Sequence, residues 1–207
     1  MRTLPLVSSS ARRRCEGVRG FLSTTVATLY LLVPGIDGAQ RDTGADLTLQ
    51  HFEKRVAAYL ALRQQVSTSA QAPTITSDPA TLQHTVDQLA DRIRRARAQA
   101  RQGDFFSDEI ARTLRTRIGQ TLRERGISST ELLSGLSEDT STTRPREMIV
   151  NGRFEWAATG QTPPAILEAL PFLPDPLEYK LVRRALVLVD VEADLVVDIL
   201  PHALPGD

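Results

Sequence analysis

The chain has 207 residues, 41% of them hydrophobic and 24% charged, which allows one hydrophobic core and excludes two large domains. Its 25 basic and 25 acidic side chains give a formal net charge of zero, but the middle of the chain is basic and its end is acidic. The single cysteine, Cys15, lies near the amino terminus, which excludes a disulfide framework and thiol redox chemistry in the rest of the chain.

The amino terminus has the order of residues that is typical of a secretion signal. A stretch with five arginines precedes the uncharged apolar segment GFLSTTVATLYLLV, residues 20–33, which Pro34 and Gly35 end. This segment is shorter than the roughly 20 residues of a membrane-spanning helix. We therefore predict a signal peptide over residues 1–39, cleaved after Ala39 or Gly38, and a periplasmic or secreted protein that is membrane-tethered if the signal is not cleaved. The alternative is a basic tail followed by a core helix.

Residues 40–136 are predicted to be helical. Apolar side chains recur every three or four residues over Leu47–Val66, which indicates an amphipathic helix. A second helix is predicted to begin with Asp78 as N-cap and Pro79 at the first helical position. Its apolar periodicity reaches about Gln102.

A third helix is predicted between Ser107, an N-cap residue followed by two acidic residues, and Gly126, a stop signal. Ser128 and Glu131 match a capping box for a short fourth helical turn. Residues 137–147 have the composition of a linker.

The last segment, residues 148–207, predicts a small β-rich module. It contains a possible strand at Met148–Asn151 and a short helix, AILEAL, after two prolines. Three further runs dense in Val, Leu and Ile predict strands at Glu178–Arg183, Leu186–Asp190 and Leu195–Leu200. We therefore predict an α+β fold, in which about three amphipathic helices precede an antiparallel β-hairpin or three-strand meander. Such a sheet needs cover on one face, which the helices or AILEAL could provide.

Three stretches of the chain support a resemblance. They are HFEKRVAAYLALR at residues 51–63, QGDFF at residues 102–106, and the tail LPFLPDPLEYKLVRRALVLVDVEADLVVDILPHALP at residues 170–205. Together they resemble a family of uncharacterised exported bacterial proteins, which share a signal peptide, a helical segment and this tail. The resemblance implies export and architecture, but no reaction.

The same tail is more distantly similar to the β-meander of periplasmic nickel and cobalt homeostasis proteins. Here Ala193 and Asp194 replace the turn glycine of that pattern, and no histidine-rich tract is present. The matching positions are Tyr179, Val182, Leu186, Leu188, Asp190, Val196 and Asp198. This similarity implies a metal-responsive accessory protein as an alternative function.

Candidate metal ligands are scattered along the chain. The three histidines, His51, His84 and His202, have no second ligand at helical spacing, and Glu53 lies on a different helix face from His51. The acids Asp190, Glu192 and Asp194, with Asp198 nearby, alternate like the first ligands of a calcium loop. However, Leu195 and Pro201 stand where such a loop needs Gly and Glu. We predict no metal site, no catalytic residue and no cofactor.

Catalytic and phosphate-binding motifs are not evident in the sequence. No serine occupies a nucleophile elbow, and neither GxGxxG nor GxxxxGK[ST] occurs. An unrecognised hydrolase, with a site assembled from distant residues, stays open as an alternative.

Ten arginines follow one another between residues 92 and 125: Arg92, Arg94, Arg95, Arg97, Arg101, Arg112, Arg115, Arg117, Arg123 and Arg125. We predict a solvated charged face that pairs with the acidic C-terminal third, with an anionic lipid or envelope polymer as the alternative partner. Nucleic acid is not expected, because aromatic residues are not interleaved and export separates the protein from it. The predicted function is that of a non-catalytic envelope binding or structural protein with an unknown envelope protein or polymer as partner.

Overall fold

Residues from Asp37 onward form an α+β arrangement, as predicted. The computed structural model describes residues 37–68, 78–137, 148–156 and 162–206. The chain divides into two units, Met1–Ile36 and Asp37–Asp207, and the description concerns the second. The predicted signal segment therefore lies almost wholly outside the described residues. Among the described helices, none combines the length and the hydrophobicity that a membrane span requires.

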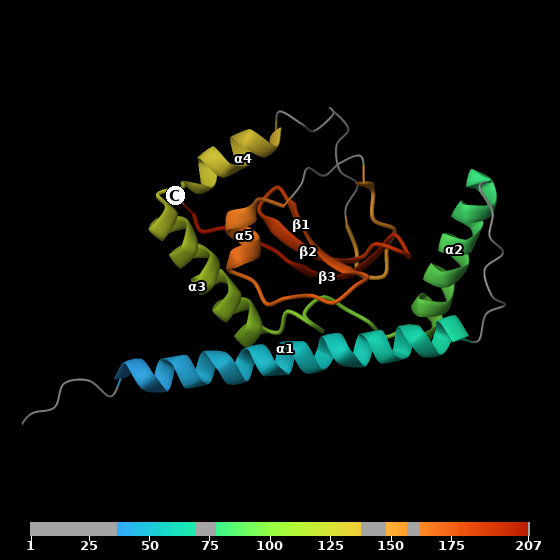
Figure 1. The fold of residues 1–207 in the computed structure, drawn as a ribbon, viewed down its shortest axis with the longest axis horizontal. Coiled ribbons are helices and arrows are strands. Elements are labelled where there is room, and N and C mark those ends of the chain that lie inside the picture. Colours follow the sequence, from blue (N-terminus) through green and yellow to red (C-terminus); the bar gives the residue numbers. More distant parts are fainter. Residues whose placement is uncertain (1–36, 69–77, 138–147, 157–161, 207) are drawn as a thin grey trace, which may run out of the picture. The chain divides into compact units, whose positions relative to one another are not determined.

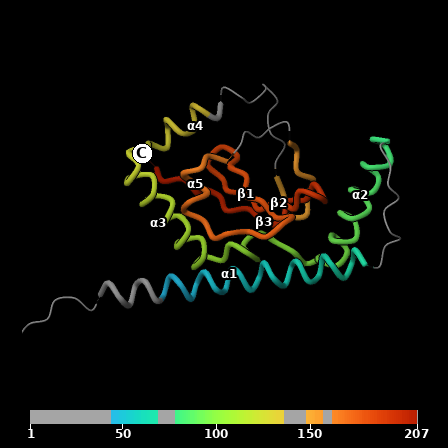
Figure 2. The backbone as a smooth tube through the Cα atoms, in the orientation of Figure 1, coloured from blue at the N-terminus to red at the C-terminus, as the bar shows by residue number. Residues whose placement is uncertain are grey.

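Figure 1 shows the order of the elements along the chain, and Figure 2 follows the same path as a tube. The described residues contain the helices α1 (Asp37–Thr68), α2 (Pro79–Ala96), α3 (Asp108–Arg125), α4 (Ser129–Ser137) and α5 (Pro164–Glu168). The strands are β1 (Leu177–Val182), β2 (Ala185–Asp190) and β3 (Leu195–Leu200).

Helix α1 is longer than predicted. The apolar periodicity marks the part that packs, since Phe52, Val56 and Tyr59 are buried at helical spacing. The helix nevertheless begins at Asp37, before the predicted start at Leu47. No proline interrupts residues 37–46, and a helix that packing has nucleated propagates easily into such a segment.

Helix α2 begins as predicted and ends earlier. The carboxylate of Asp78 accepts a hydrogen bond from the amide of Thr81 at 3.0 Å, which makes it the N-cap. The helix ends at Ala96 with Arg97 as C-cap, so the predicted end near Gln102 is wrong. The reason is tertiary, because the Arg97 side chain turns inward onto aromatic rings, as described below.

The signals around α3 and α4 are confirmed. Gly126 caps α3 in the left-handed region with φ of 64°, a conformation that glycine adopts without steric cost. The hydroxyl of Ser128 accepts a hydrogen bond from the amide of Glu131 at 3.0 Å, which is half of the predicted capping box. Ser107 precedes α3 but makes no side-chain capping bond.

The sheet is an antiparallel meander in the order β1-β2-β3, within one residue of the predicted strand bounds. A two-residue turn joins β1 to β2, since Val182 pairs with Ala185. The predicted strand at Met148–Asn151 is wrong: these residues form a turn that meets the sheet through the amide of Asn151, which donates to Val196. A short run with Asn151 at φ of 63° cannot extend as a strand.

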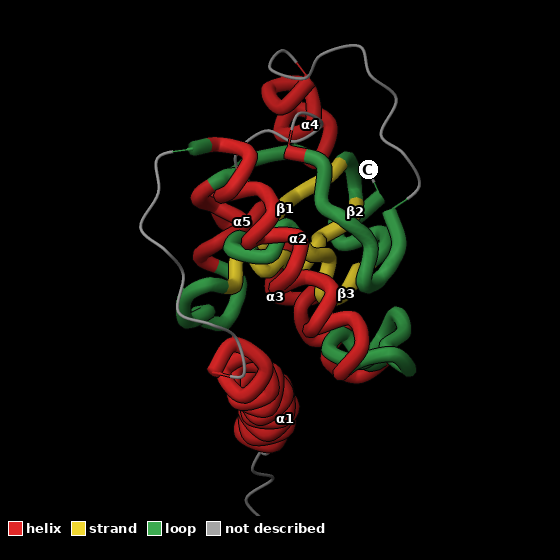
Figure 3. The backbone as a smooth tube through the Cα atoms, turned by 90° about the vertical axis from the view of Figure 1, so that its right-hand side faces the viewer, coloured by secondary structure: helices red, strands yellow, loops and turns green. Residues whose placement is uncertain are grey.

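Side chains alternate between the two faces of the sheet. One face, with Leu177, Tyr179 and Leu188, packs in the main core against the helices. The other face, with Val187 and Val189, packs around Phe154 in a second cluster. Helices thus cover one face and the 148–156 segment covers the other, so that all three strands are largely buried. Figure 3 shows the helices and strands from a second side.

Candidate functional site

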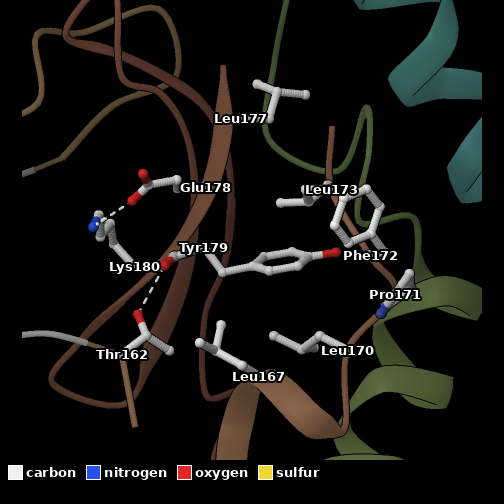
Figure 4. Close-up of a pocket in the computed structure, with 10 residues that line it drawn as sticks. All are labelled: Thr162, Leu167, Leu170, Pro171, Phe172, Leu173, Leu177, Glu178, Tyr179 and Lys180. Atoms are coloured by element: carbon white, nitrogen blue, oxygen red, sulfur yellow. Dashed lines mark hydrogen bonds and ion pairs between the residues drawn. The ribbon is translucent and has the colours of Figure 1, made fainter. Parts of the chain in front are cut away.

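An open pocket lies between α5, the connection that follows it, and strand β1 (Figure 4). Its volume is about 610 Å³, which falls in the range of ligand pockets. The residues that line it are Thr162, Leu167, Leu170, Pro171, Phe172, Leu173, Leu177, Glu178, Tyr179 and Lys180. Most of these side chains are apolar, so the pocket favours an apolar occupant.

The proline-bracketed segment PFLPDP, residues 171–176, explains why the pocket exists. Helix α5 has Pro164 in its first turn, and the prolines that follow the helix prevent its continuation. The chain returns to the sheet through a turn in which the amide of Leu177 donates to the carbonyl of Pro174 at 3.1 Å. The connection therefore passes β1 without pairing with it as a further strand.

Two large apolar side chains on the pocket wall face water. Phe172 is 88% exposed and Leu167 is 46% exposed, whereas Leu170 and Leu177 are buried. Burying a phenylalanine side chain stabilises a protein by about 1.5–3 kcal/mol. Phe172 does not contribute this energy to the fold, because its side chain is exposed. Exposed apolar side chains gathered at a concave surface mark a place for a partner or ligand.

Tyr179 reaches from β1 toward the connection, as Figure 4 shows. Its ring stacks on Phe52 of α1 with 6.4 Å between ring centres. Its hydroxyl is the one buried side-chain polar atom in the described part of the chain that has no hydrogen-bond partner. Burial raises the pKa of this hydroxyl well above its ordinary value, against a smaller lowering by Arg117, so the group stays a neutral donor.

Lys180 lines the pocket and also contacts Trp156, the tryptophan of the chain. The Lys180 ammonium lies 2.6 Å from the Glu178 carboxylate and 5.1 Å from the centre of the Trp156 ring. Trp156 in turn donates from Nε1 to Asp194 at 2.6 Å. Since the sequence contains one tryptophan, its fluorescence reports on this neighbourhood.

The acids of the predicted calcium-like series have structural partners. Asp190 is fully buried and accepts hydrogen bonds from Tyr59 and from Nε of Arg63, both at 2.8 Å, and from the amides of Glu192 and Ala193 at 3.2 Å. Arg63 also pairs with Glu192. These carboxylates therefore join α1 to the end of β2.

Asp198 anchors the QGDFF segment. Its buried carboxylate accepts hydrogen bonds from the amides of Gly103, Phe105 and Phe106 at 2.9, 2.7 and 2.8 Å, and from its neighbour Ile199 at 2.8 Å. A carboxylate with four amide donors has little capacity left for a ligand. Within the described ranges, no three His, Cys, Asp or Glu residues gather where they could hold a metal ion.

The three histidines are exposed and belong to different elements. His51 is on α1, His84 is on α2 beside Gln88 at 2.7 Å, and His202 follows β3 with φ of 49°. The structure does not assemble them with the acids into a site.

Four of the ten arginines bind the C-terminal third, chiefly through backbone carbonyls: Arg94, Arg97, Arg115 and Arg125. Arg94 donates to the carbonyl of Asn151 at 2.9 Å, and Arg115 donates to those of Pro201 and His202 at 2.8 and 3.0 Å. Arg125 pairs with Glu168. These arginines hold segments together, whereas others such as Arg95 are exposed.

Arg97 lies against two aromatic rings and is partly buried. Its guanidinium lies 5.1 Å from the Tyr59 ring centre and 5.5 Å from that of Phe105, and it donates to the carbonyl of Val197 at 3.1 Å. Desolvation lowers the pKa of Arg97, and Tyr59 and nearby acids oppose this. Its contacts make it a link between α2, α1 and β3.

The fold and its pocket define a small α+β domain that offers an apolar recess at the edge of its sheet. Sequence reasoning did not identify the pocket, although the proline-bracketed PFLPDP with its central phenylalanine could have indicated it. No family model matches the chain, and searches among curated proteins and solved structures give no match.

Proposed function

We propose that this is a non-catalytic binding protein that acts outside the cytoplasm and holds an apolar group in the pocket between α5 and β1. The observation that carries the proposal is the pocket itself, with Phe172 exposed beside apolar walls. The signal-like residues 1–39 and the resemblance to exported bacterial proteins support action in the periplasm or outside the cell.

The alternative of a metal-responsive protein has less support. Asp190 and Asp198, the two acids at the matched tail positions, already accept four hydrogen bonds each within the protein. Neither acid offers a free carboxylate oxygen in a solvent-accessible place, because both are fully buried. The pocket, in contrast, is open and apolar.

Binding is tested on the folded chain with anilinonaphthalene sulfonate, a fluorescent probe whose aromatic rings bind apolar surface. We expect the probe to bind the wild-type protein and to bind Phe172→Ser and Leu167→Ser variants much more weakly. The matched control is Leu82→Ser, which replaces a leucine of similar exposure, 49%, on α2. Equal loss in the control, or none in the pocket variants, would place probe binding elsewhere and contradict the proposal.

Export is tested by fractionating cells that express the full chain and sequencing the amino terminus of the protein in each fraction. A start near Ala39 or Gln40 in the periplasmic or secreted fraction is expected. A cytoplasmic protein that still begins at Met1 would contradict export and return attention to the arginine series.

A further inference from the structure

Strand β1 lies at the edge of the sheet, and its pairing determines which backbone groups point outward. The β1–β2 register ends at Val182 opposite Ala185, across a two-residue turn. In such a hairpin, alternate residues direct both backbone groups to the partner strand. Residues 178, 180 and 182 therefore bond β2, and residues 177, 179 and 181 direct their amides and carbonyls to the open edge.

The hydroxyl of Thr162 occupies part of this edge. It donates to the carbonyl of Tyr179 at 2.7 Å and accepts from the amide of Leu181 at 3.1 Å. A carbonyl and an amide that flank one residue, here Lys180, are the pair that a residue of a parallel strand would bond. Thr162 thus replaces the backbone amide and carbonyl of one residue of an added strand.

The next such pair flanks Glu178 and is free. The amide of Leu177 is taken by Pro174. The carbonyl of Leu177 and the amide of Tyr179 point outward and have no partner among the residues that the structure describes. Both residues line the pocket (Figure 4). The apolar recess therefore contains one hydrogen-bond acceptor and one donor, placed to bond the amide and the carbonyl of one residue of an added strand.

We infer that the occupant of the pocket is an extended peptide segment, which adds to β1 as a parallel strand beside Glu178. The side chain of the bonded residue then points to the same face as Glu178, and the apolar side chains of its two chain neighbours point to the opposite face, against Leu167, Leu170 and Phe172. This inference rests on the proposed function and names the partner's chemistry. The bound residue donates its amide to the Leu177 carbonyl and accepts from the Tyr179 amide, which is β-strand addition.

One observation favours a peptide over an acyl chain or another hydrocarbon. A hydrocarbon would offer the Leu177 carbonyl and the Tyr179 amide no hydrogen-bond partner, which is unfavourable. The charges beside the site also cancel, because Lys180 and Glu178 pair with each other. The site therefore fits an uncharged, extended segment with a large apolar residue.

The test uses four capped pentapeptides of sequence TXTXT, in which both X residues are Leu, Ile, Val or Phe, with Trp156 fluorescence as the readout on the full chain. Each peptide is compared with its analogue methylated at the amide nitrogen of the central Thr, the residue that bonds β1. We expect at least one parent peptide to bind, and methylation to weaken its binding about tenfold or more. Amide hydrogen exchange at Tyr179 should slow in the parent complex, and Phe172→Ala should weaken binding while Leu82→Ala should not.

The outcomes separate this inference from the proposed function. If methylated and parent peptides bind equally, or if only the anilinonaphthalene probe binds, the pocket captures apolar groups without strand addition, and the inference is wrong while the proposed function stands. If neither the peptides nor the probe binds, the pocket is not a binding site and both proposals fall. Binding that leaves the Tyr179 amide unprotected also overturns the inference.

Discussion

The hydroxyl of Tyr59, on α1, donates a hydrogen bond of 2.8 Å to the carboxylate of Asp190, at the end of β2. The two residues are far apart in the sequence, and their side chains meet on the helical face of the sheet. Arg63, one turn further along α1, donates to the same carboxylate oxygen. This pairing fixes the longest helix against the central strand. Its loss should therefore lower the stability of the whole domain.

Tyr59→Phe should lower the free energy of unfolding by about 1–3 kcal/mol, because it leaves a buried carboxylate with one donor fewer. The matched control is Tyr179→Phe, which removes a buried hydroxyl that has no hydrogen-bond partner among the described residues. That variant should be neutral or slightly more stable than the wild type. Urea unfolding of both variants checks the pair, and equal destabilisation would contradict the assigned roles of the two hydroxyls.

Asp198→Asn should destabilise the domain by about 3 kcal/mol. Asparagine keeps one carbonyl oxygen, and its amide group is itself a donor that opposes the backbone amides of the 103–106 segment. The control is Glu53→Gln, an exposed residue of α1, which should change little. Thermal unfolding measures both, and hydrogen exchange at Phe105 and Phe106 should accelerate selectively in Asp198→Asn. An unaltered exchange rate there would contradict the anchoring role.

Arg97→Lys should cost about 1–2 kcal/mol, although it keeps the charge. Lysine has no planar group to lie between Tyr59 and Phe105 while donating to the Val197 carbonyl. Arg95→Lys, on the exposed side of the same helix end, serves as the control and should be near neutral. If the two variants unfold at the same urea concentration, the enclosed position of Arg97 has no energetic consequence.

Stability should fall steeply at alkaline pH. Burial raises the pKa of both Tyr59 and Tyr179, and the Asp190 carboxylate raises that of Tyr59 further. Below about pH 10 the folded and unfolded states both keep these protons; above it only the unfolded state releases them, so unfolding is favoured. Phenolate absorbance from these two tyrosines should appear together with the loss of circular dichroism. Its appearance in a still folded protein would contradict this.

Gly126→Ala should destabilise the domain by about 1 kcal/mol, because alanine at φ of 64° is strained. Gly126→Asn should cost less, since asparagine tolerates the left-handed region. Gly135, within α4, has open space around it and gives a comparison: Gly135→Ala should be neutral or stabilising. The three variants are ranked by thermal unfolding, and the reverse order would show that the cap does not limit stability.

Local signals in the sequence were sufficient to place several elements. Asp78 with Pro79 starts α2, Gly126 ends α3, and alternating apolar residues between short polar turns make the meander, because capping and pleating depend on neighbours in the chain. The fold class therefore followed from sequence pattern.

Contacts between distant residues set the end of α2, the roles of the buried acids and the existence of the pocket. The side chain of Arg97, at the end of α2, packs against two aromatic rings. Asp190 and Asp198 accept hydrogen bonds from distant elements instead of forming a calcium loop. The pocket arises where α5 and its proline-rich connection pass the edge of β1. Each of these depends on contacts between residues far apart in sequence, and the energy of such contacts cannot be inferred from local pattern alone.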